Sequence, residues 1–177
     1  WENADKTQPV LQDSIEILKD YIQIWCPQSR AYTMYNDPDP LSYSGGFNDR
    51  YLVNKNGPFI DRIAKEREAG KKIWWYTCNS PEYPYANLFC NYPGVNVRAL
   101  FWQQYLFETQ GLLWWAANEW ESMTPMKTNM AVLLYPSEYF SRYHNETYEG
   151  PLASVRLDFI RDGIEDVEYM KIAEELY

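Results

Sequence analysis

Histidine and basic residues are scarce in this 177-residue chain, which carries 1 His and 16 Lys and Arg against 25 Asp and Glu, for a net charge of −9. The single His144 cannot build a His-based metal site, and it argues against a Ser-His-Asp triad. The acidic balance argues against nucleic acid, because phosphate binding requires clustered Lys and Arg. We therefore expect no metal, no cofactor and no nucleic-acid partner.

Cysteine is also rare, with only Cys26, Cys78 and Cys90. Their odd number and wide spacing argue against a disulfide scaffold and against a zinc knuckle. A bridge between Cys78 and Cys90 across one loop remains an alternative.

Long apolar runs are missing. No stretch approaches the length that spans a membrane, and no signal peptide is visible, so we expect no membrane partner. The chain begins with Trp1 rather than Met. We therefore expect it to be processed, trimmed or part of a longer protein.

Aromatic residues are abundant: 18% of the chain, with 8 Trp and 16 Tyr against 7 Phe. Trp and Tyr combine a large apolar face with a polar group, which suits the binding of sugars. A Trp-rich core is the alternative interpretation for any single one of these residues.

Two similar segments follow amphipathic stretches, and their Trp pairs lie about 40 positions apart. The first runs from Gly70 through Trp74-Trp75 to Thr77, and the second from Gly111 through Trp114-Trp115 to Ala117. A helix that ends at Gly and is followed by a short apolar strand is typical of the repeat of a parallel sheet. Because side chains alternate along a strand, one Trp of each pair is expected to face the helix layer. The other is expected to face the opposite side of the sheet, which is the interior if the sheet closes into a barrel.

The patterns predict an α/β fold of parallel strands alternating with helices and ending in a helical C-terminus. Strands are expected over 22–25, 73–77 and 112–117, and helices over 58–69, ended by Gly70, and 97–109, ended by Gly111. Residues 131–135 form a fourth strand that either extends the barrel or pairs as a hairpin. The chain is helical from Pro151, with a bend or break at Gly163.

An eight-stranded (β/α)8 TIM-type barrel requires roughly 250 residues. We therefore interpret residues 1–177 as one partial domain, the C-terminal half of such a barrel, with upstream strands missing. Its open strand edge would be covered by the missing N-terminal half of the same barrel or by a second copy of the chain.

Ligands of parallel barrels bind where the strands end, so the strand ends and the following loops hold the candidate site residues. Glu119 and Glu121 lie in such a loop and resemble the carboxylate pair of a glycosidase, although solvated loop acids are the alternative. The charged tail around Arg156 and Arg161 predicts a structural network in which each Arg reaches acids three or four positions away.

Several spaced motifs together resemble the C-terminal part of the glycoside hydrolase family 123 catalytic domain, also described as domain of unknown function 4091. The resemblance begins at about residue 25 and continues to the end of the chain. The motifs are Trp25-Cys26-Pro27, Trp75-Tyr76-Thr77-Cys78, Pro84-Tyr85-Ala86-Asn87, Arg98 with Trp102, Gly111 to Trp115 with Asn118 and Trp120, Leu134-Tyr135-Pro136, and Arg161-Asp162-Gly163-Ile164-Glu165-Asp166.

The resemblance implies a barrel enzyme that removes terminal β-linked N-acetylgalactosamine by substrate-assisted retaining hydrolysis. In that family an adjacent Asp-Glu pair assists the acetamido group and protonates the leaving oxygen. This chain contains no Asp-Glu dipeptide. We expect the pair to lie outside the chain, which leaves Glu119 as a weak catalytic candidate.

The chain would then supply the walls of the sugar site, and the partner would be a glycan or amino-sugar substrate. The expected wall residues are Trp25, Tyr76, Trp115, Asn118 and Trp120, with Asn87 and Arg98 as second choices that are equally suited to bracing a loop. Enzymes of this kind tend to be exported, so we expect an extracellular or periplasmic location.

Two other functions remain open: a carbohydrate-binding module without chemistry, and a structural half-barrel of a divergent parent. The helix-Gly-strand repeat argues against the β-sandwich that is common among binding modules.

Overall fold

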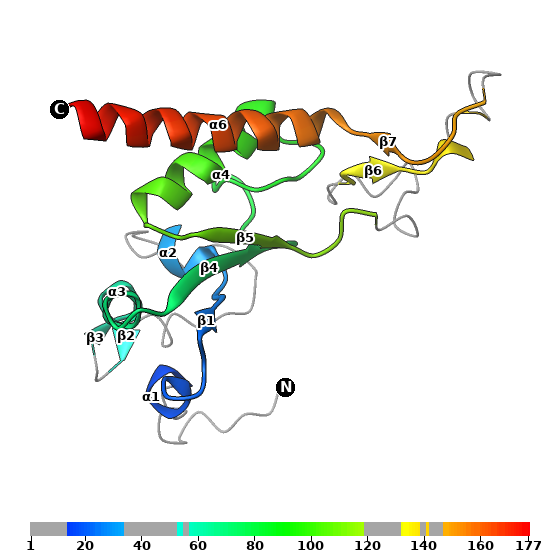
Figure 1. The fold of residues 1–177 in the computed structure, drawn as a ribbon. Coiled ribbons are helices and arrows are strands. Elements are labelled where there is room, and N and C mark those ends of the chain that lie inside the picture. Colours follow the sequence, from blue (N-terminus) through cyan, green and yellow to red (C-terminus); the bar gives the residue numbers. More distant parts are fainter. Residues whose placement is uncertain (1–13, 34–52, 55–56, 119–131, 139–140, 142–146) are drawn as a thin grey trace, which may run out of the picture.

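The computed structural model describes residues 14–33, 53–54, 57–118, 132–138, 141 and 147–177, and these form a mixed α/β fold (Figure 1). The elements in chain order are α1 (Ser14–Leu18), β1 (Ile24–Trp25), α2 (Arg30–Thr33), β2 (Val53–Asn54), β3 (Gly57–Pro58), α3 (Phe59–Glu68), β4 (Lys72–Thr77), α4 (Gly94–Leu106), β5 (Gly111–Trp114), β6 (Leu134–Tyr135), β7 (Leu152–Ala153) and α6 (Val155–Leu176).

The central sheet is parallel and has the order β1-β4-β5. Trp25 lies opposite Ile73 on β4, and Trp75 lies opposite Leu112 on β5. The predicted strands, their parallel pairing and the helical C-terminus are therefore confirmed. The half-barrel remains a prediction, since the described part of this sheet has three strands.

The end of each predicted helix has its own physical cause. Gly70 follows α3 with a φ of 86°, the left-handed conformation that glycine adopts without strain, so the predicted stop is confirmed. The predicted stop at Gly111 is wrong, because α4 ends at Leu106 and Gly111 begins β5. A Cβ atom on Gly111 would lie 2.8 Å from the indole of Trp74, so this glycine makes room for that ring.

The other sheets are two-stranded and antiparallel. β2 pairs with β3, and β6 pairs with β7 through Leu134 opposite Ala153. This pairing agrees with the antiparallel alternative for residues 131–135 rather than with a further barrel strand.

The core lies between the sheet and its helices. Ile73, Trp75 and Thr77 point to the same side of β4 and are fully buried. The Trp75 ring meets Tyr32 of α2 at 5.9 Å between ring centroids, and Tyr32 meets Phe59 of α3 at 5.3 Å, both edge to face. Such pairs add about 0.5–1.5 kcal/mol each to the burial of the rings. The aromatic cluster therefore fixes the sheet against two helices.

Helix α6 is continuous, and it lies across α4 (Figure 1). The predicted bend or break at Gly163 is wrong. A Cβ atom on Gly163 would lie 2.6 Å from the Phe101 ring of α4, and one on Gly94 would lie 2.3 Å from Phe159 of α6. These glycines allow the two helices to approach closely.

No helix in the described parts of the chain is both long enough and apolar enough to cross a membrane.

Candidate sugar-binding face

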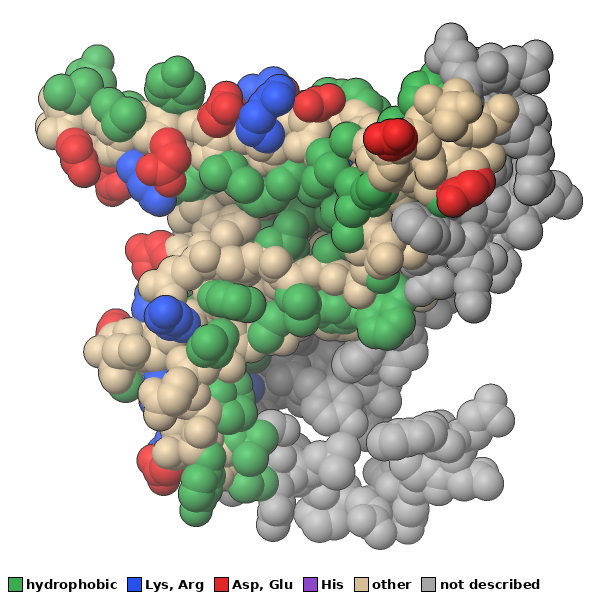
Figure 2. All heavy atoms as spheres, turned by 45° about the vertical axis from the view of Figure 1, so that its right-hand side comes forward, with side chains coloured by type: hydrophobic (Ala, Val, Ile, Leu, Met, Phe, Trp, Pro, Cys, Tyr) green, Lys and Arg blue, Asp and Glu red, His purple; other side chains and the backbone are tan. Residues whose placement is uncertain are grey.

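The side of the parallel sheet opposite the aromatic core is apolar and open. Strand alternation and the parallel register place Ile24, Trp74, Tyr76 and Leu113 on this side. Trp115 is the first residue after β5, and we assign it to the same side by continuing the alternation by one residue. We call these five residues the open face. Ile24, Leu113 and Trp115 are 45%, 47% and 60% exposed. In Figure 2, hydrophobic side chains run along the sheet below the long C-terminal helix.

Tyr76 provides a polar group on the open face. A hydrogen bond with Cys78 raises the pKa of the Tyr76 phenol to about 12, and burial contributes to the rise. The hydroxyl therefore stays protonated at neutral pH. It can donate one hydrogen bond and accept others, as recognition of an amide or a sugar hydroxyl requires.

Trp115 and Asn118 follow the carboxyl end of β5, and both are exposed. The backbone here is held from two sides. The Trp114 indole donates to the carbonyl oxygen of Ala116 at 3.1 Å, and the backbone N–H groups of Leu133 and Leu134 donate to the carbonyl oxygen of Ala117 at 3.1 and 2.9 Å. The exposed indole of Trp115 thus lies on a backbone segment that these hydrogen bonds hold in place.

Trp25, by contrast, lies on the core side of the sheet. Its side chain is buried, and its indole Nε1 donates to Glu66 Oε2 of α3 at 3.3 Å. The register explains this placement, because Trp25 lies opposite the buried Ile73. The geometry favours support of the strand over contact with a ligand.

Asn87 lies in the loop between β4 and α4 and is fully buried. Its amide nitrogen donates to the carbonyl oxygens of Cys78 and Pro81 at 3.0 and 2.9 Å, and its amide oxygen accepts from the backbone N–H of Leu88 at 2.7 Å. The side chain closes the loop on itself, which agrees with the bracing alternative.

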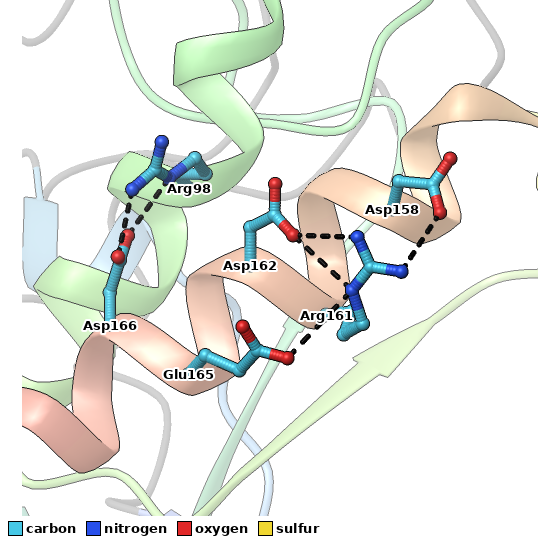
Figure 3. Close-up of polar contacts among 6 residues, drawn as sticks. All are labelled: Arg98, Asp158, Arg161, Asp162, Glu165 and Asp166. Atoms are coloured by element: carbon cyan, nitrogen blue, oxygen red, sulfur yellow. Dashed lines mark hydrogen bonds and ion pairs between the residues drawn. The ribbon is translucent and has the colours of Figure 1, made fainter.

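Arg98 of α4 is directed at α6 (Figure 3). Its Nε and Nη2 atoms donate to the two carboxylate oxygens of Asp166 at 2.9 and 2.8 Å. The Trp102 indole donates to the same carboxylate at 2.7 Å. Arg98 and Trp102 therefore join the two helices, and the open face lies on the other side of the sheet.

The two tail arginines behave differently. Arg161 forms ion pairs with Asp158 and Glu165, three and four positions away as predicted, and also with the adjacent Asp162 (Figure 3). For Arg156 the predicted pairing with nearby acids is wrong. Its guanidinium donates to the carbonyl oxygens of Leu88, Phe89 and Cys90 at 3.1, 3.1 and 2.5 Å.

The structural role predicted for Arg156 agrees with this geometry, but its partners could not be predicted, because they are backbone atoms 66 to 68 positions away. Backbone acceptors leave no signature in side-chain patterns.

Several expected residues lie outside the described residues. They are Glu119 and Trp120, together with Glu121 and His144. All three cysteines are free, so the alternative bridge between Cys78 and Cys90 is not formed. Among the described residues, no group of three or more His, Cys, Asp or Glu side chains could hold a metal ion.

A cavity of about 860 Å³ lies on the core side of the sheet, between β5, α4 and α6. Its lining includes Leu112, Trp114, Ile160 and Ile164. Leu112 and Trp114 alternate with the open-face residues of β5, so this cavity belongs to the helix layer and is separate from Tyr76.

The comparisons with known proteins point to one family. The family model described as glycoside hydrolase 123, catalytic domain, matches residues 13–173. No curated protein matches. Among solved structures, the chain is similar to a family 123 glycoside hydrolase from Clostridium perfringens, which was studied for glycolipid glycan hydrolysis, at 18% identity and a TM-score of 0.49. That match covers 86% of this chain and 25% of the Clostridium perfringens enzyme, so this chain spans about a quarter of the length of that enzyme.

The family model thus covers nearly the whole chain, from before β1 to the last turns of α6. The chain belongs to the glycoside hydrolase family 123 catalytic-domain family.

Proposed function

We propose that this chain is part of a glycoside hydrolase that releases terminal β-linked N-acetylgalactosamine, and that its open face forms one wall of the sugar site. Family membership supports the hydrolase class. The observation that carries the proposal is the exposure of Trp115 directly after β5, at the same carboxyl end of the parallel sheet as Tyr76 of β4.

The two side chains offer complementary contacts. The exposed Trp115 indole can stack on the apolar face of a pyranose ring. The protonated Tyr76 hydroxyl and the Asn118 amide can form hydrogen bonds with the acetamido group and the ring hydroxyls. Trp120, outside the described residues, is a further wall residue in this proposal, whereas Trp25, Asn87 and Arg98 support the site from behind.

The proposed reaction is substrate-assisted. The acetamido oxygen of the substrate attacks the anomeric carbon and forms a C–O bond, while the bond from that carbon to the leaving oxygen breaks. A carboxylic acid outside this chain gives its proton to the leaving oxygen and then accepts one from the attacking water. Two inversions at the same carbon give net retention, without a protein nucleophile.

The chain's part in this scheme is orientation. A sugar held against Trp115 presents its 2-acetamido group in one direction, and the hydroxyl of Tyr76 restricts rotation of that group. Holding the reacting atoms close together is a major source of rate enhancement in intramolecular attack.

The test compares two substrates of the full-length protein, a β-N-acetylgalactosaminide and the matching β-galactoside, which lacks the acetamido group. The proposal predicts hydrolysis of the first only, with a β-configured first product by NMR. Equal hydrolysis of both sugars would contradict substrate assistance. Binding of the sugar without hydrolysis would instead support the carbohydrate-binding alternative.

A further inference from the structure

The segment that follows β1 continues alongside β4, beyond the two residues that form the regular strand. Gln28 forms an isolated parallel bridge with Tyr76 of β4. The backbone N–H of Tyr76 donates to the carbonyl oxygen of Pro27, and the backbone N–H of Ser29 donates to the carbonyl oxygen of Tyr76, both at 2.8 Å. The offset between paired residues is the same as within β1, so the register continues to Gln28 without a bulge.

This register places the Gln28 side chain on the same side of the sheet as the open face. Residues that lie opposite each other in neighbouring strands project to the same side, and Tyr76 is an open-face residue. Alternation from Trp25, which lies on the core side three residues earlier, gives the same result. Gln28 therefore lies beside Tyr76, one strand spacing of about 4.8 Å away, at the carboxyl end of the sheet.

The backbone of Gln28 is held in place, while its side chain is available to a ligand. Its carbonyl oxygen accepts from the backbone N–H of Ala31 at 2.9 Å, at the start of α2. The neighbouring Ser29 is fully buried, whereas Gln28 is half-buried. Within the described part of the chain, no residue forms a hydrogen bond with the Gln28 side-chain amide. This amide thus offers donors and an acceptor from a fixed backbone position.

We propose that Gln28 binds the 3-hydroxyl group of the terminal sugar, next to the acetamido group that Tyr76 contacts in the proposed function. The inference rests on that function and adds a specificity-determining residue to it. The ring carbon that bears the acetamido group has two neighbours: carbon 1 carries the leaving oxygen, and carbon 3 carries a hydroxyl group. The leaving oxygen meets the carboxylic acid outside this chain, which leaves the 3-hydroxyl group for Gln28. Leu113, the other neighbour of Tyr76, has no polar side-chain atom.

The test uses the full-length protein with two substrates, p-nitrophenyl β-N-acetylgalactosaminide and its 3-deoxy analogue. The wild type should hydrolyse the analogue with a kcat/KM about three- to tenfold lower, the effect of one lost neutral hydrogen bond. Gln28→Met keeps the length of the side chain and removes the amide. It should lower kcat/KM for the 3-hydroxyl substrate by about the same factor, without lowering kcat/KM for the 3-deoxy analogue.

Gln23→Met provides the matched control, because Gln23 is an exposed residue of the same type directly before β1, at the amino end of the sheet. It should change kcat/KM for neither substrate. Three results would overturn the inference: an equal loss on both substrates in Gln28→Met, no loss on the 3-hydroxyl substrate, or a wild type that does not distinguish the two sugars. A wild-type protein that hydrolyses neither substrate would contradict the proposed function itself, and the inference would fall with it.

Discussion

Arg98 on α4 and Asp166 on α6 form a two-bond ion pair, with donor–acceptor distances of 2.9 and 2.8 Å, across 68 positions of sequence. Two parallel hydrogen bonds from a planar guanidinium to a carboxylate restrict the relative orientation of the two groups more than a single lysine–carboxylate contact does. The pair therefore fixes the rotation of α6 on α4, and with it the direction from which Arg156 reaches the β4–α4 loop.

The first prediction concerns pH. The hydrogen bond from Arg98, followed by that from Trp102, holds the pKa of Asp166 below its usual range. A carboxyl whose folded-state pKa is depressed stabilises the protein above its unfolded-state pKa of about 3.9, and this contribution is lost as the pH falls through the folded value. Asp166→Asn should therefore lower the urea midpoint at pH 7, and its difference from wild type should shrink as the pH falls below about 4.

A double-mutant cycle provides the control for this effect. In an Arg98→Met background, most of the pH-dependent part of the Asp166→Asn effect should disappear, and the hydrogen bond from Trp102 accounts for the remainder. A pH-dependent difference as large as that in the wild-type background would show that another group causes it.

The second prediction concerns helix packing at Gly163. Alanine is the better helix former by about 1 kcal/mol, yet we expect Gly163→Ala to destabilise the protein by about 1–3 kcal/mol, because the new Cβ would lie 2.6 Å from the Phe101 ring. Chemical denaturation measures the change. Adding Phe101→Leu should cost less in the Gly163→Ala background than alone, and a Gly163→Ala variant that is more stable than wild type would contradict the close approach.

The third prediction concerns Arg156. Arg156 uses two nitrogen atoms, Nε for Leu88 and Nη2 for Phe89 and Cys90, whereas lysine has one. Arg156→Lys should therefore reduce stability by about 1–3 kcal/mol, the range for loss of hydrogen bonds to a charged group. Hydrogen exchange should accelerate most at residues 88–92. Arg161→Lys, on the exposed side of the same helix, should leave both measurements nearly unchanged. Equal effects of the two substitutions would contradict a specific link between Arg156 and the loop.

Local features of the fold could be predicted from the sequence, because they depend on nearby residues. Gly70 ends α3 because glycine readily adopts a positive φ, and the Trp74-Trp75 pair divides between two faces because side chains alternate along a strand. The parallel order followed from helices that alternate with strands.

Features that depend on distant partners could not be predicted. Gly111 and Gly163 were interpreted as a helix stop and a bend, but each makes room for an aromatic ring, of Trp74 and Phe101 respectively. The sequence predicts Trp25 as a wall residue of the sugar site, whereas the structure places it on the core side of the sheet. A strand of two residues does not indicate which of its sides is open until its register with β4 is known. The register of β1 on β4 and the backbone partners of Arg156 depend on how distant segments pack together in the folded protein.

The fourth prediction concerns Trp115, which we propose contacts the sugar from the open face. The measurement is kcat/KM for a β-N-acetylgalactosaminide with Trp115→Ala in the full-length protein, together with the free energy of unfolding. We expect a loss of at least about tenfold in kcat/KM with little change in stability, since Trp115 is largely exposed. Trp75→Ala, the matched control from the core, should instead destabilise the protein by about 3–5 kcal/mol. Unchanged turnover in Trp115→Ala, or destabilisation comparable to that of Trp75→Ala, would show that Trp115 does not contact the sugar as proposed.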